Sequence, residues 1–259
     1  VSTPWGLFEY LRMPFGLKNC PSTFQRYIDT VLNGIPNIFV YLDDIIVFSE
    51  SIEEHKQHVR LVIQKLTEHG LCINLAKSYF FRERVEYLGF EFDRFGYRPL
   101  QSAHPKVQAI PIPKDKTDVL SFLGKVNYYR AHIPNFAEIA APLYELTHNK
   151  TRFKWDDRCQ VAFDRLKTLF AERLALSPLK PDGKFELYTD ASDVACGGVL
   201  MQDGRPVEFF SRRFTPTEQR YSAHERETYG VVCALKYFRT ILLGSKFKVY
   251  SDHKPLKYW

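Results

Sequence analysis

IFVYLDDIIVF, residues 38–48, places two adjacent carboxylates, Asp43 and Asp44, in the middle of an apolar run. Nine of its eleven residues are apolar or aromatic, which is typical of a buried strand. Two ionised carboxylates in such a strand would repel each other and lose their hydration. A β-hairpin with the pair at its bend relieves this cost, and a divalent cation neutralises the charges. The stretch therefore predicts a strand–Asp-Asp–strand hairpin that presents acids to metal ions.

An ordinary surface turn is the competing interpretation, because adjacent Asp residues are common in turns. Solvated turns usually contain Gly, Ser, Asn or Lys, and none of these occurs between Ile38 and Phe48. The apolar flanks therefore favour the metal-binding hairpin.

The bulk composition is that of a globular protein with two or three modest domains. The chain has 259 residues, of which 45% are hydrophobic and 25% charged, so cores can form. Five widely spaced cysteines without a C-x-x-C pair argue against a disulfide framework or zinc site and suit a reducing compartment. No apolar run approaches the length of a membrane span.

The net charge of +6 is concentrated in the middle of the chain. Residues 101–180 hold 13 Lys+Arg against 8 Asp+Glu, whereas residues 1–100 hold 11 against 12. A segment that grips a nucleic-acid backbone needs such an excess. A solvated basic face explains an imbalance of this size equally well.

Periodicity and turn residues divide the rest of the chain into expected elements. A helix opens at Pro21, and Ser51 with Glu54 forms a capping box for a second helix that stops at Gly70. We expect strands at 8–11 and 72–75, a second hairpin with a strand over 85–92 and a loop at 93–96, and a linker over 101–116. Helices should follow from Thr117, within 134–147 and over 155–173, then strands at 185–189, 198–202 and 207–211, a helix over 222–243 and a strand at 247–251.

A second group of acids is expected in this last part of the chain. Asp190 and Asp252 each end a predicted strand, so they converge if the two strands are neighbours. Glu227 lies on the apolar stripe of the helix between them, which also carries Ala234 and Phe238. An inward-facing Glu requires a partner, and a basic side chain and a metal ion shared with the two Asp residues are both consistent with the spacing.

Short motifs follow one another along the chain in a fixed order. They are Met13-Pro14-Phe15-Gly16-Leu17-Lys18-Asn19, Tyr41-Leu42-Asp43-Asp44, Tyr87-Leu88-Gly89, Phe122-Leu123-Gly124, Asn127-Tyr128-Tyr129-Arg130, Thr189-Asp190-Ala191-Ser192, Glu227, and Ser251-Asp252-His253-Lys254-Pro255-Leu256. In this order and spacing, over nearly the whole chain, they resemble the reverse transcriptases of gypsy-type LTR retrotransposons. The chain resembles an internal fragment of such a pol polyprotein.

The resemblance implies roles for the polymerase motifs. Asp43 would bind a catalytic Mg²⁺ in the palm, with Asp44 beside it and Tyr41 near the primer terminus. Phe15 and Gly16 would border the incoming nucleotide. The family's primer-grip hairpin would include Leu88 and Gly89.

The resemblance also implies an RNase H site, in which Asp190, Glu227 and Asp252 bind the metals that cleave RNA in an RNA–DNA hybrid. The cofactor would be Mg²⁺, with Mn²⁺ as an alternative. The implied partners are an RNA template, a DNA primer, RNA–DNA hybrid and dNTPs, with no membrane. The implied location is intracellular, in a cytoplasmic particle of the element.

The fold class that follows is α+β. Residues 1–100 would form a partial palm without the fingers or the family's first catalytic Asp, residues 101–178 the thumb and connection, and residues 179–259 an RNase H-like mixed α/β domain truncated at its C-terminus. The family's fourth RNase H acid would lie beyond Asp252, and Cys20 stands where the family has a small Ala. We expect this chain alone to polymerise poorly or not at all.

Two other functions are compatible with the sequence. The first is a non-catalytic nucleic-acid-binding remnant of a decayed or domesticated element, which incomplete acid sets would suit. The second is a stand-alone RNase H-like hydrolase with a degenerate N-terminal platform. Cleavage of an RNA–DNA hybrid separates the remnant from the hydrolase.

Overall fold

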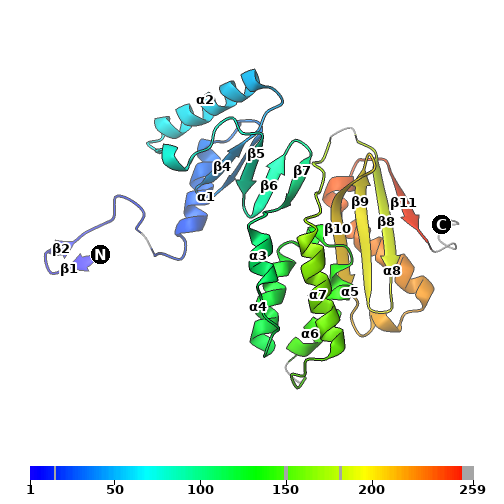
Figure 1. Ribbon diagram of the computed structural model, residues 1–259. Coiled ribbons are helices and arrows are strands. Elements are labelled where there is room, and N and C mark those ends of the chain that lie inside the picture. The colour runs from blue at the N-terminus through cyan, green and yellow to red at the C-terminus, as the bar shows by residue number, and fades with distance from the viewer. Residues whose placement is uncertain (15, 149–150, 181–182, 253–259) are drawn as a thin grey trace. The chain divides into compact units, whose positions relative to one another are not determined.

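The computed structural model describes the chain except residues 15, 149–150, 181–182 and 253–259. It contains two compact units, Val1–Glu83 and Arg84–Trp259, and both helices and sheets occur (Figure 1). Among the described residues, no helix combines the length and the apolar character needed to span a membrane.

In the first unit, two helices pack against the predicted Asp-Asp hairpin. The hairpin consists of β3 (Ile38–Tyr41) and β4 (Asp44–Val47), which pair antiparallel with Tyr41 opposite Asp44. Helices α1 (Cys20–Val31) and α2 (Ile52–Glu68) supply most of the buried side chains of this unit, and Leu32 and Ile35 lie just after α1. Its core consists of Ile28, Val31, Leu32, Ile35, Val62 and Leu66, with Ile38, Val40, Ile45 and Val47 packed against it.

Two predicted strands in this unit are wrong. Residues 8–11 form no strand, because their side chains find no core: Leu11 is 92% exposed. The nearest strands are the short pair β1 (Ser2–Thr3) and β2 (Gly6–Leu7). Residues 72–75 also form no strand, because the Asn74 side chain accepts a hydrogen bond from the Ala76 amide and starts the 3-10 helix η1 (Leu75–Lys77).

The predicted capping box at α2 is half formed. Ser51 Oγ accepts a hydrogen bond from the Glu54 amide at 3.2 Å, as a helix N-cap should. The Glu54 carboxylate accepts from the amide of Glu50, not from that of Ser51. The helix nevertheless begins where the sequence predicts.

The second unit starts with a three-stranded meander. Its strands are β5 (Arg84–Tyr87), β6 (Phe90–Asp93) and β7 (Gly96–Pro99). The predicted continuous strand over 85–92 is wrong, since Leu88 and Gly89 form a turn with φ of +47° and +82°. Positive φ at both central residues is typical of a type I′ hairpin.

A helical segment follows the meander. It comprises α3 (Ala103–Gln108), α4 (Lys116–Asn127), η2 (Arg130–His132), α5 (Phe136–Ile139), α6 (Ala141–Thr147) and α7 (Asp157–Ala171). The predicted linker over 101–116 thus contains a helix, because Pro105 is tolerated in a first helical turn and Val107 joins the core. That core is built around Phe122, Leu123, Phe163 and Phe170, which lie on α4 and α7.

The chain then forms a four-stranded mixed sheet in the order β10-β9-β8-β11. Its strands are β8 (Phe185–Ala191), β9 (Ala195–Gln202), β10 (Arg205–Arg213) and β11 (Phe247–Ser251), with η3 (Glu218–Arg220) and α8 (Ala223–Tyr237) between β10 and β11. The predicted single helix over 222–243 is divided in two in the structure: α8 ends at Tyr237, and α9 (Arg239–Leu242) follows.

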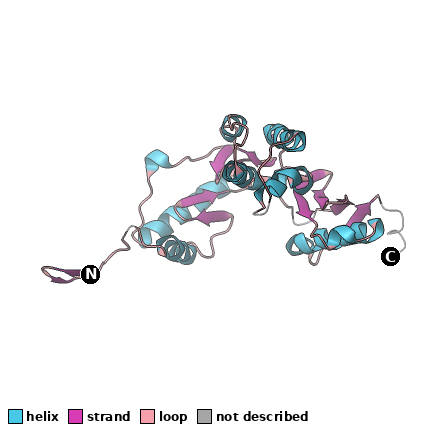
Figure 2. Ribbon diagram, turned by 90° about the horizontal axis from the view of Figure 1, so that it is seen from below, coloured by secondary structure: helices cyan, strands magenta, loops and turns pink. Residues whose placement is uncertain are grey.

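The two faces of this sheet have different neighbours. A Cβ at Gly198 would contact Ala234 of α8, whereas one at Gly197 would meet Asn135, the residue before α5. Successive residues of a strand point to opposite faces, so α8 covers one face and the α5 region the other. Figure 2 shows α8 running along its face of the sheet.

Candidate metal-binding and nucleic-acid sites

Asp190 and Asp252 lie at the same end of two adjacent strands. β11 pairs parallel with β8, and the register places Ser251 opposite Thr189. Asp190 directly follows Thr189, and Asp252 directly follows Ser251, so the two acids lie side by side at the same end of the sheet, where Asp190 still pairs with Gly197 of β9. The condition that the two strands be neighbours is met.

Glu227 completes this group from α8. One carboxylate oxygen from each of Asp190, Glu227 and Asp252 lies within 4.8 Å of the other two. Both Asp side chains are exposed, whereas Glu227 is half-buried on the inward side of the helix. Within the described ranges, these three residues form the only such group of possible ligands.

The electrostatics of Glu227 favour a cation. Burial raises the pKa of its carboxyl, and the negative charges of Asp252 and Asp190 raise it further. The backbone N–H of Ala191 and the charge of Arg226 lower the pKa and offset part of this effect. Glu227 Oε2 is buried and has no hydrogen-bond partner among the described residues. Three converging carboxylates with one unsatisfied oxygen suit a hard divalent cation.

The alternative interpretation gives Glu227 a basic partner. The candidate is Arg226, but no hydrogen bond or ion pair between the two side chains is among the described contacts. Arg226 is adjacent in sequence, yet its guanidinium pairs with Asp193 and with backbone carbonyls. Glu225 lies elsewhere and forms a capping box with Ser222. The basic-partner interpretation therefore gains no support from the described contacts.

Asp43 and Asp44 occupy the bend of the first hairpin, as predicted. Asp43 lies in the turn and Asp44 begins β4, and both side chains are exposed. The bend thus removes the desolvation cost that burial would impose. Leu42, the first turn residue, has a φ of +54°, a conformation that branched side chains rarely adopt. No further acid, histidine or cysteine joins this pair in a three-ligand group among the residues described.

Gln25 on α1 holds the backbone of this bend, and the sequence analysis missed it. Its Oε1 accepts a hydrogen bond from the Leu42 amide at 2.6 Å, and its Nε2 donates to the Val40 carbonyl at 3.2 Å. Nε2 also donates to Asp29 Oδ1 at 2.8 Å, which fixes the orientation of the carboxamide. Only the i,i+4 spacing of Gln25 and Asp29 is visible in the sequence; the contact with the hairpin is not.

The remaining predicted residues lie in three places. Tyr41 ends β3 and is exposed, and Gly16 is exposed with a φ of +86°. In the second unit, the Tyr128 hydroxyl donates to the carbonyl of Leu88 at 2.6 Å, and the Tyr129 hydroxyl donates to that of Gly89 at 3.4 Å. These contacts join the Leu88-Gly89 turn to the end of α4. Phe15 and residues 253–256 of the last motif lie outside the described residues.

Two family models match the chain. The model described as "Reverse transcriptase (RNA-dependent DNA polymerase)" matches residues 2–92, and "RNase H-like domain found in reverse transcriptase" matches residues 155–249. Together they include the Asp-Asp hairpin, Asp190 and Glu227.

Curated relatives match almost the whole chain. The chain is 40% identical to the retrovirus-related Pol polyprotein from transposon 297 of Drosophila melanogaster, over 99% of the chain and 25% of the relative. It is 36% identical to that from transposon gypsy of the same organism, over 98% and 26%. The transposon Tf2-3 polyprotein of Schizosaccharomyces pombe is 35% identical over 98% and 20%. The chain thus spans about a quarter of the length of the two Drosophila melanogaster relatives and about a fifth of that from Schizosaccharomyces pombe.

Solved structures with the same arrangement are also reverse transcriptases. The foamy viral protease-reverse transcriptase in complex with dsDNA matches with a TM-score of 0.83 and 28% identity, over 96% of this chain and 54% of that one. The same protein in complex with RNA/DNA hybrid matches with a TM-score of 0.81 and 28% identity, over 93% and 34%. The predicted α+β fold class is confirmed. The chain therefore belongs to the reverse transcriptases of retrotransposon Pol polyproteins and carries segments of their polymerase domain and their RNase H-like domain.

Proposed function

We propose that this chain is part of an RNA-directed DNA polymerase with RNase H activity, and that its own chemistry resides in Asp190, Glu227 and Asp252. The observation that carries the proposal is the convergence of these three carboxylates, with Glu227 Oε2 buried and unsatisfied. The foamy viral relative that has the same fold is described in complex with RNA/DNA hybrid. An RNA–DNA hybrid is accordingly the substrate that we propose.

The three carboxylates would hold Mg²⁺, with Mn²⁺ as an alternative. Such a cation, when bound, activates a water nucleophile and stabilises charge on the phosphate in transfer reactions. The protein's contribution is to hold the ligands. Asp190 and Asp252 are fixed by the parallel pairing of β8 with β11, and Glu227 is fixed by α8 and by the amide of Ala191.

The polymerase roles are part of the same proposal. Asp43 and Asp44 would bind Mg²⁺, and Tyr41 would lie near the primer end. Phe15 and Gly16 would border the dNTP. Leu88 and Gly89 would contact the primer on an RNA template. Exposure of the Asp pair at a bend that Gln25 holds supports this. Residues 1–100, 101–178 and 179–259 would be palm, thumb with connection, and RNase H-like domain.

A matched pair of glutamate variants tests the RNase H proposal. Glu227→Gln removes one ligand charge, and we expect its affinity for Mg²⁺ to fall at least about tenfold. Glu225→Gln is the control, because Gln can replace Glu in a capping box and Glu225 is not in the acid group. Isothermal titration calorimetry of the full chain with Mg²⁺ measures both.

Cleavage of a labelled RNA–DNA hybrid is the second readout. The wild type should cleave only the RNA strand, and Asp190→Asn and Glu227→Gln should abolish cleavage. Binding of hybrid without cation binding or cleavage would instead support the non-catalytic remnant. Equal Mg²⁺ affinity in the wild type and Glu227→Gln would reject the proposed site.

A further inference from the structure

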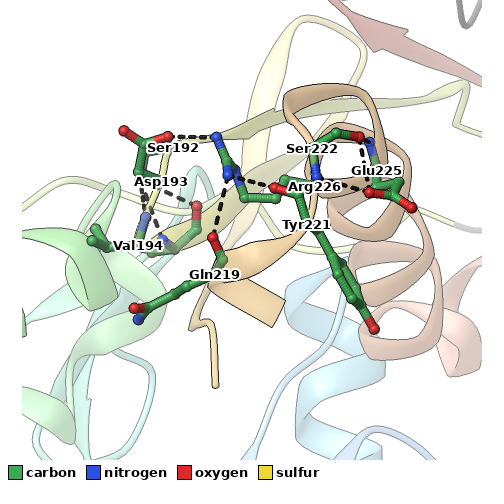
Figure 3. Close-up of polar contacts among 9 residues, drawn as sticks. Ser192, Asp193, Val194, Gln219, Tyr221, Ser222, Glu225 and Arg226 are labelled. Atoms are coloured by element: carbon green, nitrogen blue, oxygen red, sulfur yellow. Dashed lines mark hydrogen bonds and ion pairs between the residues drawn. The ribbon is translucent and has the colours of Figure 1, made fainter. Parts of the chain in front are cut away.

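The guanidinium of Arg226 joins three segments of the RNase H-like domain. Its Nη1 donates hydrogen bonds to the carbonyls of Tyr221 at 2.7 Å and Gln219 at 3.4 Å, and its Nη2 pairs with Asp193 (Figure 3). Gln219 belongs to η3, and Asp193 to the turn between β8 and β9. The Arg226 side chain itself is only 16% exposed.

Asp193, the ion-pair partner of Arg226, lies in a turn that begins directly after β8, the strand that carries Asp190. Ser192 stiffens this turn: its Oγ accepts hydrogen bonds from the amides of Val194 and Ala195 at 3.3 and 3.2 Å. Its own amide donates to the carbonyl of Ala195 at 2.8 Å. Fixing Asp193 therefore fixes the end of β8.

We call the contacts of Arg226 with Asp193, Gln219 and Tyr221 the clamp. Its other end is the first turn of α8. There the Ser222 amide donates to the Glu225 carboxylate at 2.8 Å, and the Glu225 amide donates to Ser222 Oγ at 3.3 Å. Arg226 is the next residue, and Glu227 follows it directly. Because helical residues move as one rigid turn, holding Arg226 also holds Glu227.

We infer that Arg226, through Asp193, is a positioning residue that sets the spacing between Asp190 and Glu227. This inference rests on the proposed RNase H site. Arg226 does not touch the acid group in this role; it ties the strand of one ligand to the helix of another. Asp193 is 87% exposed, and exposed ion pairs contribute little to stability. The Arg226–Asp193 ion pair therefore affects the relative positions of Asp190 and Glu227 more than it affects the stability of the fold.

A comparison of two cations with different coordination requirements distinguishes a change in the positions of the acids from a loss of negative charge. Mg²⁺ requires near-ideal octahedral geometry, whereas Ca²⁺ accepts flexible coordination. In Asp193→Ala we expect the Kd for Mg²⁺ to rise about tenfold and that for Ca²⁺ less than about threefold. Asp193→Asn retains an acceptor for Arg226 and should restore most of the Mg²⁺ affinity.

Asp203→Asn is the control for the lost charge. Asp203 also lies in a turn of this sheet and pairs with a basic residue, Lys180, at 3.7 Å, but the turn joins β9 to β10. Its removal should leave the ratio of the two Kd values unchanged. Equal losses for Mg²⁺ and Ca²⁺ in Asp193→Ala, or the same selectivity change in the control, would overturn the inference.

Hydrogen exchange keeps the inference testable without a cation. In the metal-free full chain, Asp193→Ala should speed amide exchange at Ala191 and in the first turn of α8, and Asp203→Asn should not. Unchanged exchange in Asp193→Ala would refute the clamp. A wild type that binds neither cation would refute the proposed site, and the exchange result would still decide on Arg226.

Discussion

Leu42 and Gln25 have opposite effects on the stability of the bend in the Asp-Asp hairpin. A positive φ is unfavourable for Leu by roughly 1 kcal/mol, and it occurs at the first turn residue, where glycine is preferred in type II′ turns. The Gln25 carboxamide compensates, because it bonds the Leu42 amide and the Val40 carbonyl, as a neighbouring strand would. Gln25 therefore fixes the backbone that directly precedes Asp43.

We expect Gln25→Leu to free this backbone without unfolding the unit. Leucine keeps the approximate volume but offers neither hydrogen bond, so amide exchange at Leu42 should accelerate about tenfold, as expected for the loss of roughly 1.4 kcal/mol of local stability. Exchange measured by NMR reports the change. Gln64→Leu is the control, since Gln64 bonds only the i+4 acid Glu68 among the contacts described. Equal exchange at Leu42 in both variants would contradict this role.

At the scale of elements, β7 depends on one glycine for its contact with residue 176. A Cβ at Gly96 would lie 1.9 Å from the carbonyl oxygen of Leu176, which is backbone and cannot rotate away. The next residue, Tyr97, forms a bridge with Leu176, with hydrogen bonds of 2.9 Å in both directions. This bridge ties the meander to the segment that leads into the sheet.

Gly96→Ala should therefore destabilise the second unit by about 3 kcal/mol or more, because backbone must shift. Gly204→Ala is the matched control: its φ is also positive, at +75°, but its Cβ would meet nothing within 4 Å. We expect it to cost about 1 kcal/mol, the conformational penalty alone. Urea unfolding of both variants gives the two values. Similar costs would show that the Leu176 contact is not limiting.

At the scale of the whole molecule, the chain consists of two compact units that meet in sequence at Glu83 and Arg84. Residues 78–83 form no helix or strand, and Tyr79, Phe81 and Arg82 are exposed. Proteases cut exposed segments that lack regular structure. The boundary is therefore expected to be accessible to proteases.

Limited trypsin digestion should cut early at Lys77, Arg82 or Arg84, as well as in the exposed N-terminal stretch that carries Arg12 and Lys18. The product that begins at the boundary should persist, because the meander, the helical segment and the mixed sheet share contacts such as that of Arg130 with the Ser211 carbonyl at 2.5 Å. Mass spectrometry of early time points identifies the cuts. Lys167 is the internal control, since its Nζ is bonded to the carbonyls of Gln108 and Ile110. An early cut at Lys167 would contradict the expectation.

Much of this architecture could be predicted, because short-range patterns report local structure. A continuous apolar run around two acids located the Asp-Asp hairpin, and helical spacing placed Glu227 on the inward side of α8. Such patterns do not report what lies across from an element. They could not show that Gln25 holds the hairpin or that Arg226 reaches Asp193.

Turns were the other source of error. Leu88 has an apolar side chain, and periodicity placed it inside a strand, yet its φ is positive. The contacts of Leu88 and Gly89 with Tyr128 and Tyr129 come from residues about forty positions away, and tertiary contacts override local preference. Roles for these residues, unlike their positions, stay predictions.

The parallel pairing of β8 with β11 has a consequence for synthesis of the chain. Parallel strands need a long crossover between them, and here α8 and α9 are made before β11. A nascent chain therefore has Asp190 and Glu227 in place while Asp252 is still inside the ribosome. A cation at the proposed site would need all three acids, so it would bind only after β8, β9 and β10 have been made. The first three strands must therefore assemble on their own hydrogen-bonded ladders and hydrophobic contacts, without help from the site.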